Sequence, residues 1–123
     1  MPKAHFILLY VDSPKASGDF YRALLGREPV ESSPTFVMFA LAPELMLGLW
    51  SRHTVEPPPA AGGGGGELAF TAEGAKAVDA TYASWKALGL PIVQAPTEME
   101  FGRTFVALDP DGHRLRVFWP AGD

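Results

Sequence analysis

Two stretches, ALLGREPV at residues 23–30 and KALGLPIV at residues 86–93, decide how this chain folds. In each stretch apolar residues precede a glycine, Gly26 or Gly89, and a proline followed by a β-branched residue comes two or three positions later. Glycine readily adopts the left-handed conformation just past a helix end, so each stretch predicts that a helix stops and a strand begins. Because the same transition occurs twice in one chain, the sequence predicts an internal repeat.

The segments around the two glycines extend this repeat. Each half opens with a run typical of a strand, at residues 5–11 and 67–71. Ser13 and Pro14 favour the start of the first helix, as N-cap and first helical residue. The further strands that we expect lie at 28–32, 35–41 and 45–51, and at 91–94, 104–108 and 114–119. The sequence thus predicts an α+β fold of two tandem β-α-β-β-β modules, with a helix outside each part of a curved sheet. A ferredoxin-like domain is the alternative, but it has fewer strands per helix.

A run of prolines and glycines, PPPAAGGGGG at residues 57–66, separates the two halves. Such a run cannot pack a core and is typical of a linker. We expect a single domain over residues 1–123, with module one at about 4–55, the linker at about 56–66 and module two at about 67–120.

The composition excludes several classes of function. The net charge is −4 and the sequence has no long basic run, so neither nucleic acid nor an anionic membrane is an expected partner. Cysteine is absent, which excludes disulfides, thiolate metal sites and a cysteine nucleophile. No apolar stretch approaches the length of about 20 residues that spans a bilayer. The N-terminal residues lack the pattern of a signal peptide, and we expect a cytoplasmic protein.

Two motifs in a fixed order carry a family resemblance. FYRALLG at residues 20–26 follows an apolar strand that opens at His5, and DPDGHRLRVF at residues 109–118 combines a tight turn with an apolar strand. In this order they resemble the vicinal oxygen chelate superfamily of glyoxalases, extradiol dioxygenases and bleomycin resistance proteins. The resemblance implies that the modules curl into a cup-like mixed sheet with a site on its inner face. It also implies a homodimer, with each site formed by one chain or shared between two.

Metal-dependent members of that superfamily place four ligands on the inner face, and the resemblance puts these places at His5, Gly48, Glu67 and Arg116. Glycine has no side chain to donate, and a guanidinium has no lone pair. A guanidinium about 4 Å from a divalent ion would repel each of its unit charges by about 4 kcal/mol at an effective dielectric near 20. We therefore expect no metal cofactor. If a divalent metal is bound as the alternative, His5 and Glu67 are its ligands.

Glu67 and Arg116 are expected to form a bidentate ion pair if both face the cup. Two interpretations of this pair remain open. The ion pair closes off a former metal site, or Arg116 binds an anionic group of a ligand. The resemblance also favours His5 as a cavity-facing hydrogen-bonding or acid–base group.

Aromatic residues supply the other candidates for ligand binding. Strand alternation places Phe118 on the face of Arg116, and Trp50 on the face of Gly48, where the missing side chain leaves space. Phe101 and Arg103 are candidates for the rim of the site, since family members often use this region as a loop over it.

These features predict a binding protein rather than an enzyme. The first hypothesis is metal-independent binding of a small molecule, anionic or aromatic, by residues His5, Trp50, Glu67, Phe101, Arg103, Arg116 and Phe118. The alternative is a metal-dependent lyase, isomerase or dioxygenase of the glyoxalase type. A third hypothesis is an interaction module whose cup is vestigial.

Overall fold

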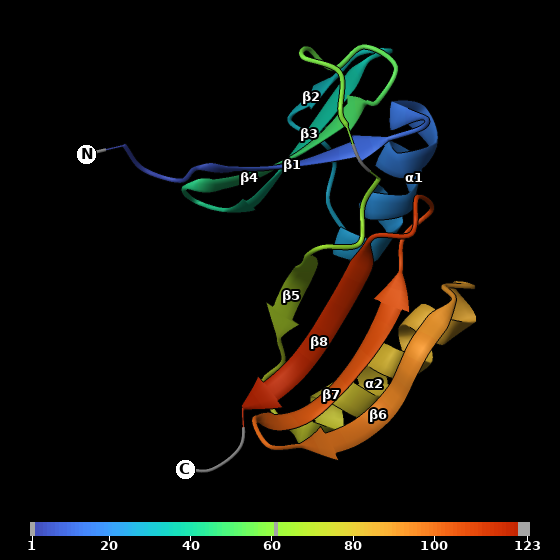
Figure 1. The fold of residues 1–123 in the computed structure, drawn as a ribbon. Coiled ribbons are helices and arrows are strands. Elements are labelled where there is room, and N and C mark those ends of the chain that lie inside the picture. The colour runs from blue at the N-terminus through green and yellow to red at the C-terminus, as the bar shows by residue number, and fades with distance from the viewer. Residues whose placement is uncertain (1, 61, 121–123) are drawn as a thin grey trace. The chain divides into compact units, whose positions relative to one another are not determined.

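The computed structural model describes residues 2–60 and 62–120 of the chain (Figure 1). Met1, residues 121–123 and Ala61 of the predicted linker lie outside the described residues. The chain separates into two compact units, Met1–Gly62 and Gly63–Asp123, and the boundary between them falls inside the predicted linker. These units correspond to modules one and two.

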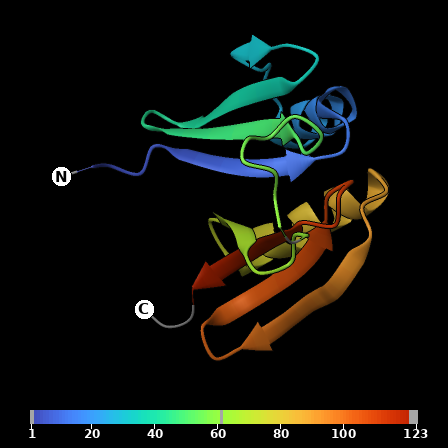
Figure 2. The ribbon, with the colours of Figure 1, turned by 45° about the horizontal axis from the view of Figure 1, so that its top comes forward.

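Module one contains a single helix packed on one face of a 4-stranded sheet. Its elements are β1 (Phe6–Val11), α1 (Pro14–Leu25), β2 (Glu31–Ser32), β3 (Phe36–Ala42) and β4 (Leu45–Ser51). The strand order is β1-β4-β3-β2, with β1 parallel to β4 and the other pairs antiparallel. Figure 2 shows β1, β4 and β3 side by side, with α1 against one face.

Module two repeats this topology. Its elements are β5 (Glu67–Thr71), α2 (Ala75–Ala87), β6 (Ile92–Met99), β7 (Gly102–Leu108) and β8 (Arg114–Pro120). The strand order is β5-β8-β7-β6, again with one parallel pair, β5 and β8. The predicted α+β fold of two β-α-β-β-β modules is confirmed.

The helix ends follow from the residues that the sequence singled out. Ser13 caps α1, because its hydroxyl accepts a hydrogen bond from the N–H of Ala16 at 3.1 Å. Gly26 ends α1 with φ 66°, and Gly89 follows the end of α2 with φ 92°. Both glycines therefore adopt the positive φ that the two quoted stretches predict.

Several strand boundaries differ from the prediction. The strand expected at 28–32 is shorter, since β2 covers only Glu31–Ser32. The turn expected around Phe101 is tighter, because β6 continues to Met99 and β7 already begins at Gly102. Pairing of Glu98 with Arg103 across the two strands extends the ladder into the region expected to be a loop.

Each module buries its core between its helix and one face of its sheet. In module one the buried residues include Phe39, Leu47 and Leu49, and Tyr21 of α1 is fully buried. In module two Phe105 of β7 is fully buried and packs edge-on against Trp85 of α2, at 5.4 Å between ring centroids. The face of each sheet that lies away from its helix is called the open face below.

The helices of the described residues are too short or too polar to cross a membrane.

Candidate ligand-binding site

An ion pair joins the first and last strands of module two on its open face. Arg116 of β8 donates from Nε to Oε1 of Glu67 at 2.7 Å and from Nη2 to Oε2 at 3.1 Å. The expected bidentate pair therefore forms, across the two parallel neighbours β5 and β8. The pKa of Glu67 lies below its ordinary value of 4.5, chiefly because Arg116 donates hydrogen bonds to the carboxylate. Partial burial acts in the opposite direction and raises this pKa.

Two further residues of this cluster were missed by the sequence reasoning. Thr104 of β7 accepts from Nη1 of Arg116 at 3.1 Å, and its own hydroxyl donates to the carbonyl of Val117 at 2.9 Å. Arg114 places Nε 3.1 Å from Oε2 of Glu67. Strand alternation alone could have indicated Arg114, since it lies two residues before Arg116 and so on the same face. Thr104 depends on the pairing of β7 with β8.

The cluster carries a surplus of positive charge. The single carboxylate of Glu67 lies between the guanidinium groups of Arg114 and Arg116, so one negative charge faces two positive ones and the formal charge is +1. Nε of Arg114 is buried and makes no hydrogen bond, although it lies 3.1 Å from Oε2 of Glu67. A buried charged donor without an acceptor is unfavourable, so this face is suited to a further anionic acceptor.

Two aromatic rings border Arg116 on the same face. The rings of Phe101 and Phe118 lie edge to face, 6.0 Å apart between centroids. The guanidinium of Arg116 lies 5.7 Å from the centroid of the Phe101 ring. Glu67, Phe101, Arg116 and Phe118 are therefore brought together as the sequence predicts, and we call these four residues with Thr104 and Arg114 the Arg116 cluster.

Arg103 does not join this cluster. It lies one residue before Thr104 on β7 and therefore on the opposite face, toward α2. There its guanidinium pairs with Asp79 of α2 at 2.8 Å and with Glu98 of β6 at 2.9 Å. Arg103 thus links three elements of module two instead of lying at the rim beside Arg116.

The open face of module one is aromatic. Trp50 of β4 makes edge-to-face contacts with Tyr10 of β1 and Phe36 of β3, at 6.4 and 6.5 Å between centroids. His5 directly precedes β1, and its carbonyl accepts from the N–H of Met46 at 2.8 Å. The first open-face position of β1 belongs to Phe6, so alternation places His5 toward the side of α1.

The space expected at Gly48 is occupied by its neighbours, which corrects the prediction. A Cβ on Gly48 would lie 2.7 Å from a terminal methyl of Leu8 and 2.8 Å from the ring of Phe36. These two side chains close over the glycine and leave no gap beside Trp50. Gly48 therefore permits close packing on the open face.

Replacing Gly48 with alanine is expected to lower the free energy of unfolding by about 1 kcal/mol, because Leu8 and Phe36 must move aside. The displaced Phe36 ring should also change the emission of Trp50, which it contacts. Urea unfolding followed by tryptophan fluorescence measures both effects. Gly66→Ala is the matched control, since its added Cβ would meet nothing within 4 Å. Equal stability of the two variants would contradict the packing role of Gly48.

The lowered pKa of Glu67 predicts a pH dependence of stability. A carboxyl whose pKa is lower in the folded state contributes stability above its unfolded pKa and loses it as the pH falls through the folded pKa. The stability difference between the wild type and Glu67→Gln should therefore be complete above the ordinary value of 4.5 and shrink below it. Urea titrations at a series of pH values from about 6 to about 3 measure this difference. A difference that grows toward acid pH would contradict the ion pair.

The donors on these faces do not fit a metal ion. Among residues 2–60 and 62–120, no three His, Asp or Glu side chains come close enough together to hold one. Both carboxylate oxygens of Glu67 are already held by arginines, and the guanidinium of Arg116 lies where the resemblance places a fourth ligand. Three protein ligands are the usual set for catalytic zinc, and this set is not present there.

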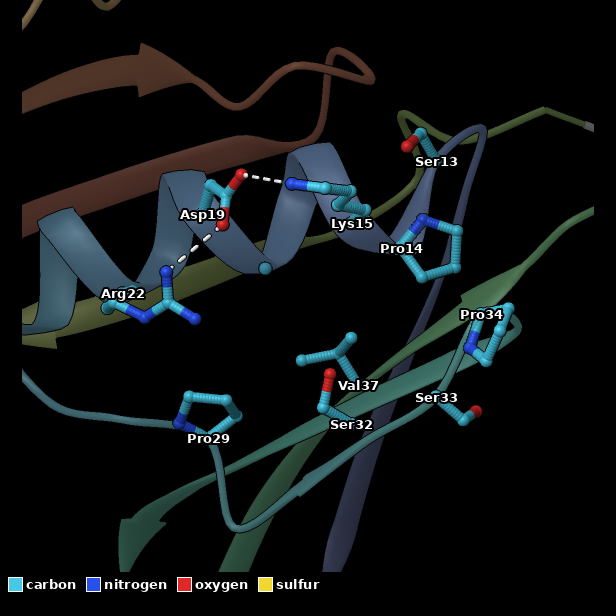
Figure 3. Close-up of a pocket in the computed structure, with 11 residues that line it drawn as sticks. Ser13, Pro14, Lys15, Asp19, Arg22, Pro29, Ser32, Ser33, Pro34 and Val37 are labelled. Atoms are coloured by element: carbon cyan, nitrogen blue, oxygen red, sulfur yellow. Dashed lines mark hydrogen bonds and ion pairs between the residues drawn. The ribbon is translucent and has the colours of Figure 1, made fainter.

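A hollow of about 590 Å³ lies elsewhere on module one, between α1 and the edge strand β2 (Figure 3). Lys15 and Arg22 of α1 both pair there with Asp19, at 3.4 and 3.1 Å. All three of its ionisable lining residues are thus in ion pairs, and none of the predicted site residues lines it. We therefore place the candidate site at the Arg116 cluster.

Fold and site together define a two-module β-α-β-β-β protein whose polar site residues lie on an open sheet face. The chain belongs to the Glyoxalase/Bleomycin resistance protein/Dioxygenase superfamily, whose family model matches residues 3–117. The phenazine antibiotic resistance protein EhpR of Enterobacter agglomerans is 33% identical over 113 residues, which cover 89% of this chain and 86% of EhpR.

Solved structures share this fold. The solution structure of protein ATC0852 from Agrobacterium tumefaciens is 60% identical, with a TM-score of 0.90 over 99% of this chain and 100% of that one. A glyoxalase-related enzyme from Fulvimarina pelagi is 20% identical and shares the fold, with a TM-score of 0.86 over 99% of this chain and 94% of that one.

Proposed function

We propose that this protein binds a flat aromatic molecule with an anionic group, without a metal, at the open face of module two. The observation that carries the proposal is the Arg116 cluster, in which two guanidinium groups share one carboxylate beside two aromatic rings. A guanidinium pairs with a planar carboxylate through two parallel hydrogen bonds, and Phe101 and Phe118 supply apolar surface for a ring system.

The relative EhpR narrows the class of ligand. Its name connects it with phenazine antibiotics, and it is 33% identical to this chain. Phenazines are flat tricyclic aromatics, which matches the combination of rings and positive charge in the Arg116 cluster. We therefore choose phenazine-1-carboxylate as the probe and phenazine-1-carboxamide, which has the same ring system without the charge, as its control.

Isothermal titration calorimetry tests the proposal. The protein should bind phenazine-1-carboxylate about tenfold more tightly than the carboxamide, since hydrogen bonds to a charged group contribute about 1.5 kcal/mol or more. Treatment with EDTA should leave the affinity unchanged. Failure of both compounds to bind, or binding that requires an added divalent metal, would overturn the proposal.

We also propose that the protein forms a homodimer. The side chains of Phe6, Leu8 and Tyr10 on the open face of β1 are 56%, 45% and 40% exposed. An exposed row of large apolar side chains is typical of a surface that associates with a second chain. Light scattering after gel filtration measures the mass, and a monomer at micromolar concentration would overturn this part.

A further inference from the structure

We propose that Glu67 is an internal competitor of the ligand: its carboxylate occupies the guanidinium edge of Arg116 that a bound carboxylate would use, so the ligand must displace it. The inference rests on the proposed function, because it concerns regulation of the same site. It goes beyond that function by giving Glu67 a role opposite to that of an anchor.

Glu67 occupies the edge of Arg116 that a ligand carboxylate would use. Glu67 uses both of its oxygens on Nε and Nη2 of Arg116, at 2.7 and 3.1 Å. This edge of a guanidinium offers two parallel N–H groups, which is the arrangement that a carboxylate binds most strongly. A ligand carboxylate can use the same edge only if Glu67 leaves it.

The side chain of Arg116 would stay in place when Glu67 leaves. Its Nη1 also donates to Thr104 at 3.1 Å, and Thr104 is fully buried and fixed to the carbonyl of Val117. The side chain of Arg116 is only 17% exposed, and its guanidinium also lies beside the ring of Phe101. The guanidinium is therefore held in position independently of Glu67.

Glu67 also has a second partner, Arg114, toward which its carboxylate can move. Nε of Arg114 lies 3.1 Å from Oε2 of Glu67, yet it makes no hydrogen bond and is buried. A small rotation of the Glu67 side chain toward Arg114 would satisfy this donor and free the edge of Arg116. The exchange leaves two guanidinium groups with two carboxylates, which neutralises the surplus charge of the cluster.

The test compares two variants that remove one negative charge each. Glu67→Gln removes the competing carboxylate while keeping the shape of the side chain. Glu98→Gln is the matched control, since Glu98 pairs with Arg103 on the face toward α2. Each variant is titrated with phenazine-1-carboxylate and with phenazine-1-carboxamide in the calorimeter, after thermal unfolding has verified that it is folded.

We expect Glu67→Gln to bind phenazine-1-carboxylate about tenfold more tightly than the wild type, the effect of removing one competing charged pair. Its affinity for the carboxamide should stay unchanged, and Glu98→Gln should match the wild type with both compounds. Glu67→Asp keeps the charge but shortens the reach to Arg116. Its affinity for phenazine-1-carboxylate should therefore lie between those of the wild type and Glu67→Gln. Glu67→Asp also serves as a second variant if Glu67→Gln does not fold.

The outcomes separate this inference from the proposed function. If the wild type binds the carboxylate and Glu67→Gln binds it equally or more weakly, the competitor role is overturned while the proposed function stands. If the wild type binds neither compound and Glu67→Gln binds the carboxylate, competition by Glu67 at Arg116 is supported, while the proposed function of the wild type is overturned. If no variant binds either compound, both the proposed function and the inference drawn from it are overturned.

Discussion

Replacing Phe105 with alanine should lower the free energy of unfolding of module two by about 3–5 kcal/mol, the usual cost of truncating a fully buried aromatic side chain. Phe105 is 0% exposed and lies where β7 packs on α2. Its ring contacts Trp85 at 5.4 Å and Tyr82 at 5.5 Å between centroids, both edge to face.

Urea unfolding followed by fluorescence measures this change, and Trp85 reports on the affected contact directly. Phe101→Ala is the matched control, because Phe101 is 43% exposed and its loss should cost less than about 1 kcal/mol. Equal destabilisation by Phe105→Ala and Phe101→Ala would contradict the role of Phe105 in packing α2 on its sheet.

Sequence reasoning succeeded for the fold because the decisive signals are local. Gly26 and Gly89 each take a positive φ, a property of the glycine itself and its immediate neighbours. The turn at Asp109-Pro110-Asp111-Gly112 forms for the same reason: Gly112 donates to the carbonyl of Asp109 at 3.0 Å and has φ 83°. Signals of this kind need no knowledge of which strands become neighbours.

The site depended on pairing between distant strands, and the sequence predicted it less completely. The pair of Glu67 and Arg116 was expected because the family resemblance supplied the register that brings β5 beside β8. Thr104 was missed because its role comes from lying opposite Phe118 across β7 and β8. Gly48 was misjudged because side chains from both neighbouring strands, Leu8 and Phe36, close over it.

The sequence predicted least accurately on which face of a sheet the residues near strand ends lie. A shift of one residue moves a side chain to the other face of a sheet. β1 begins at Phe6, one residue after the expected start at His5, and alternation along the strand places Phe6, and not His5, on the open face. Arg103 was expected in a loop, but β7 already includes it, and its face is fixed by Asp79 of α2 and Glu98 of β6. No local pattern in the sequence reveals those partners.

Replacing Arg116 with methionine should weaken binding of phenazine-1-carboxylate about 100-fold. Loss of the charged hydrogen bonds removes the roughly tenfold preference for the carboxylate over the carboxamide. A second factor of about ten arises because Glu67 loses its main partner and then repels the ligand's charge. The carboxamide should lose little affinity, since Phe101 and Phe118 remain.

Arg103→Met is the matched control for this substitution, because it removes the same charge from the opposite face of the same module. Arg103 pairs with Asp79 and Glu98, so its loss should lower stability while the affinity for phenazine-1-carboxylate stays within about twofold of the wild type. Calorimetry with both compounds and both variants separates a specific anion site from a general effect of net charge. If Arg103→Met weakened carboxylate binding as much as Arg116→Met, attraction by net charge alone would account for the affinity, and the Arg116 cluster would lose its role as the site.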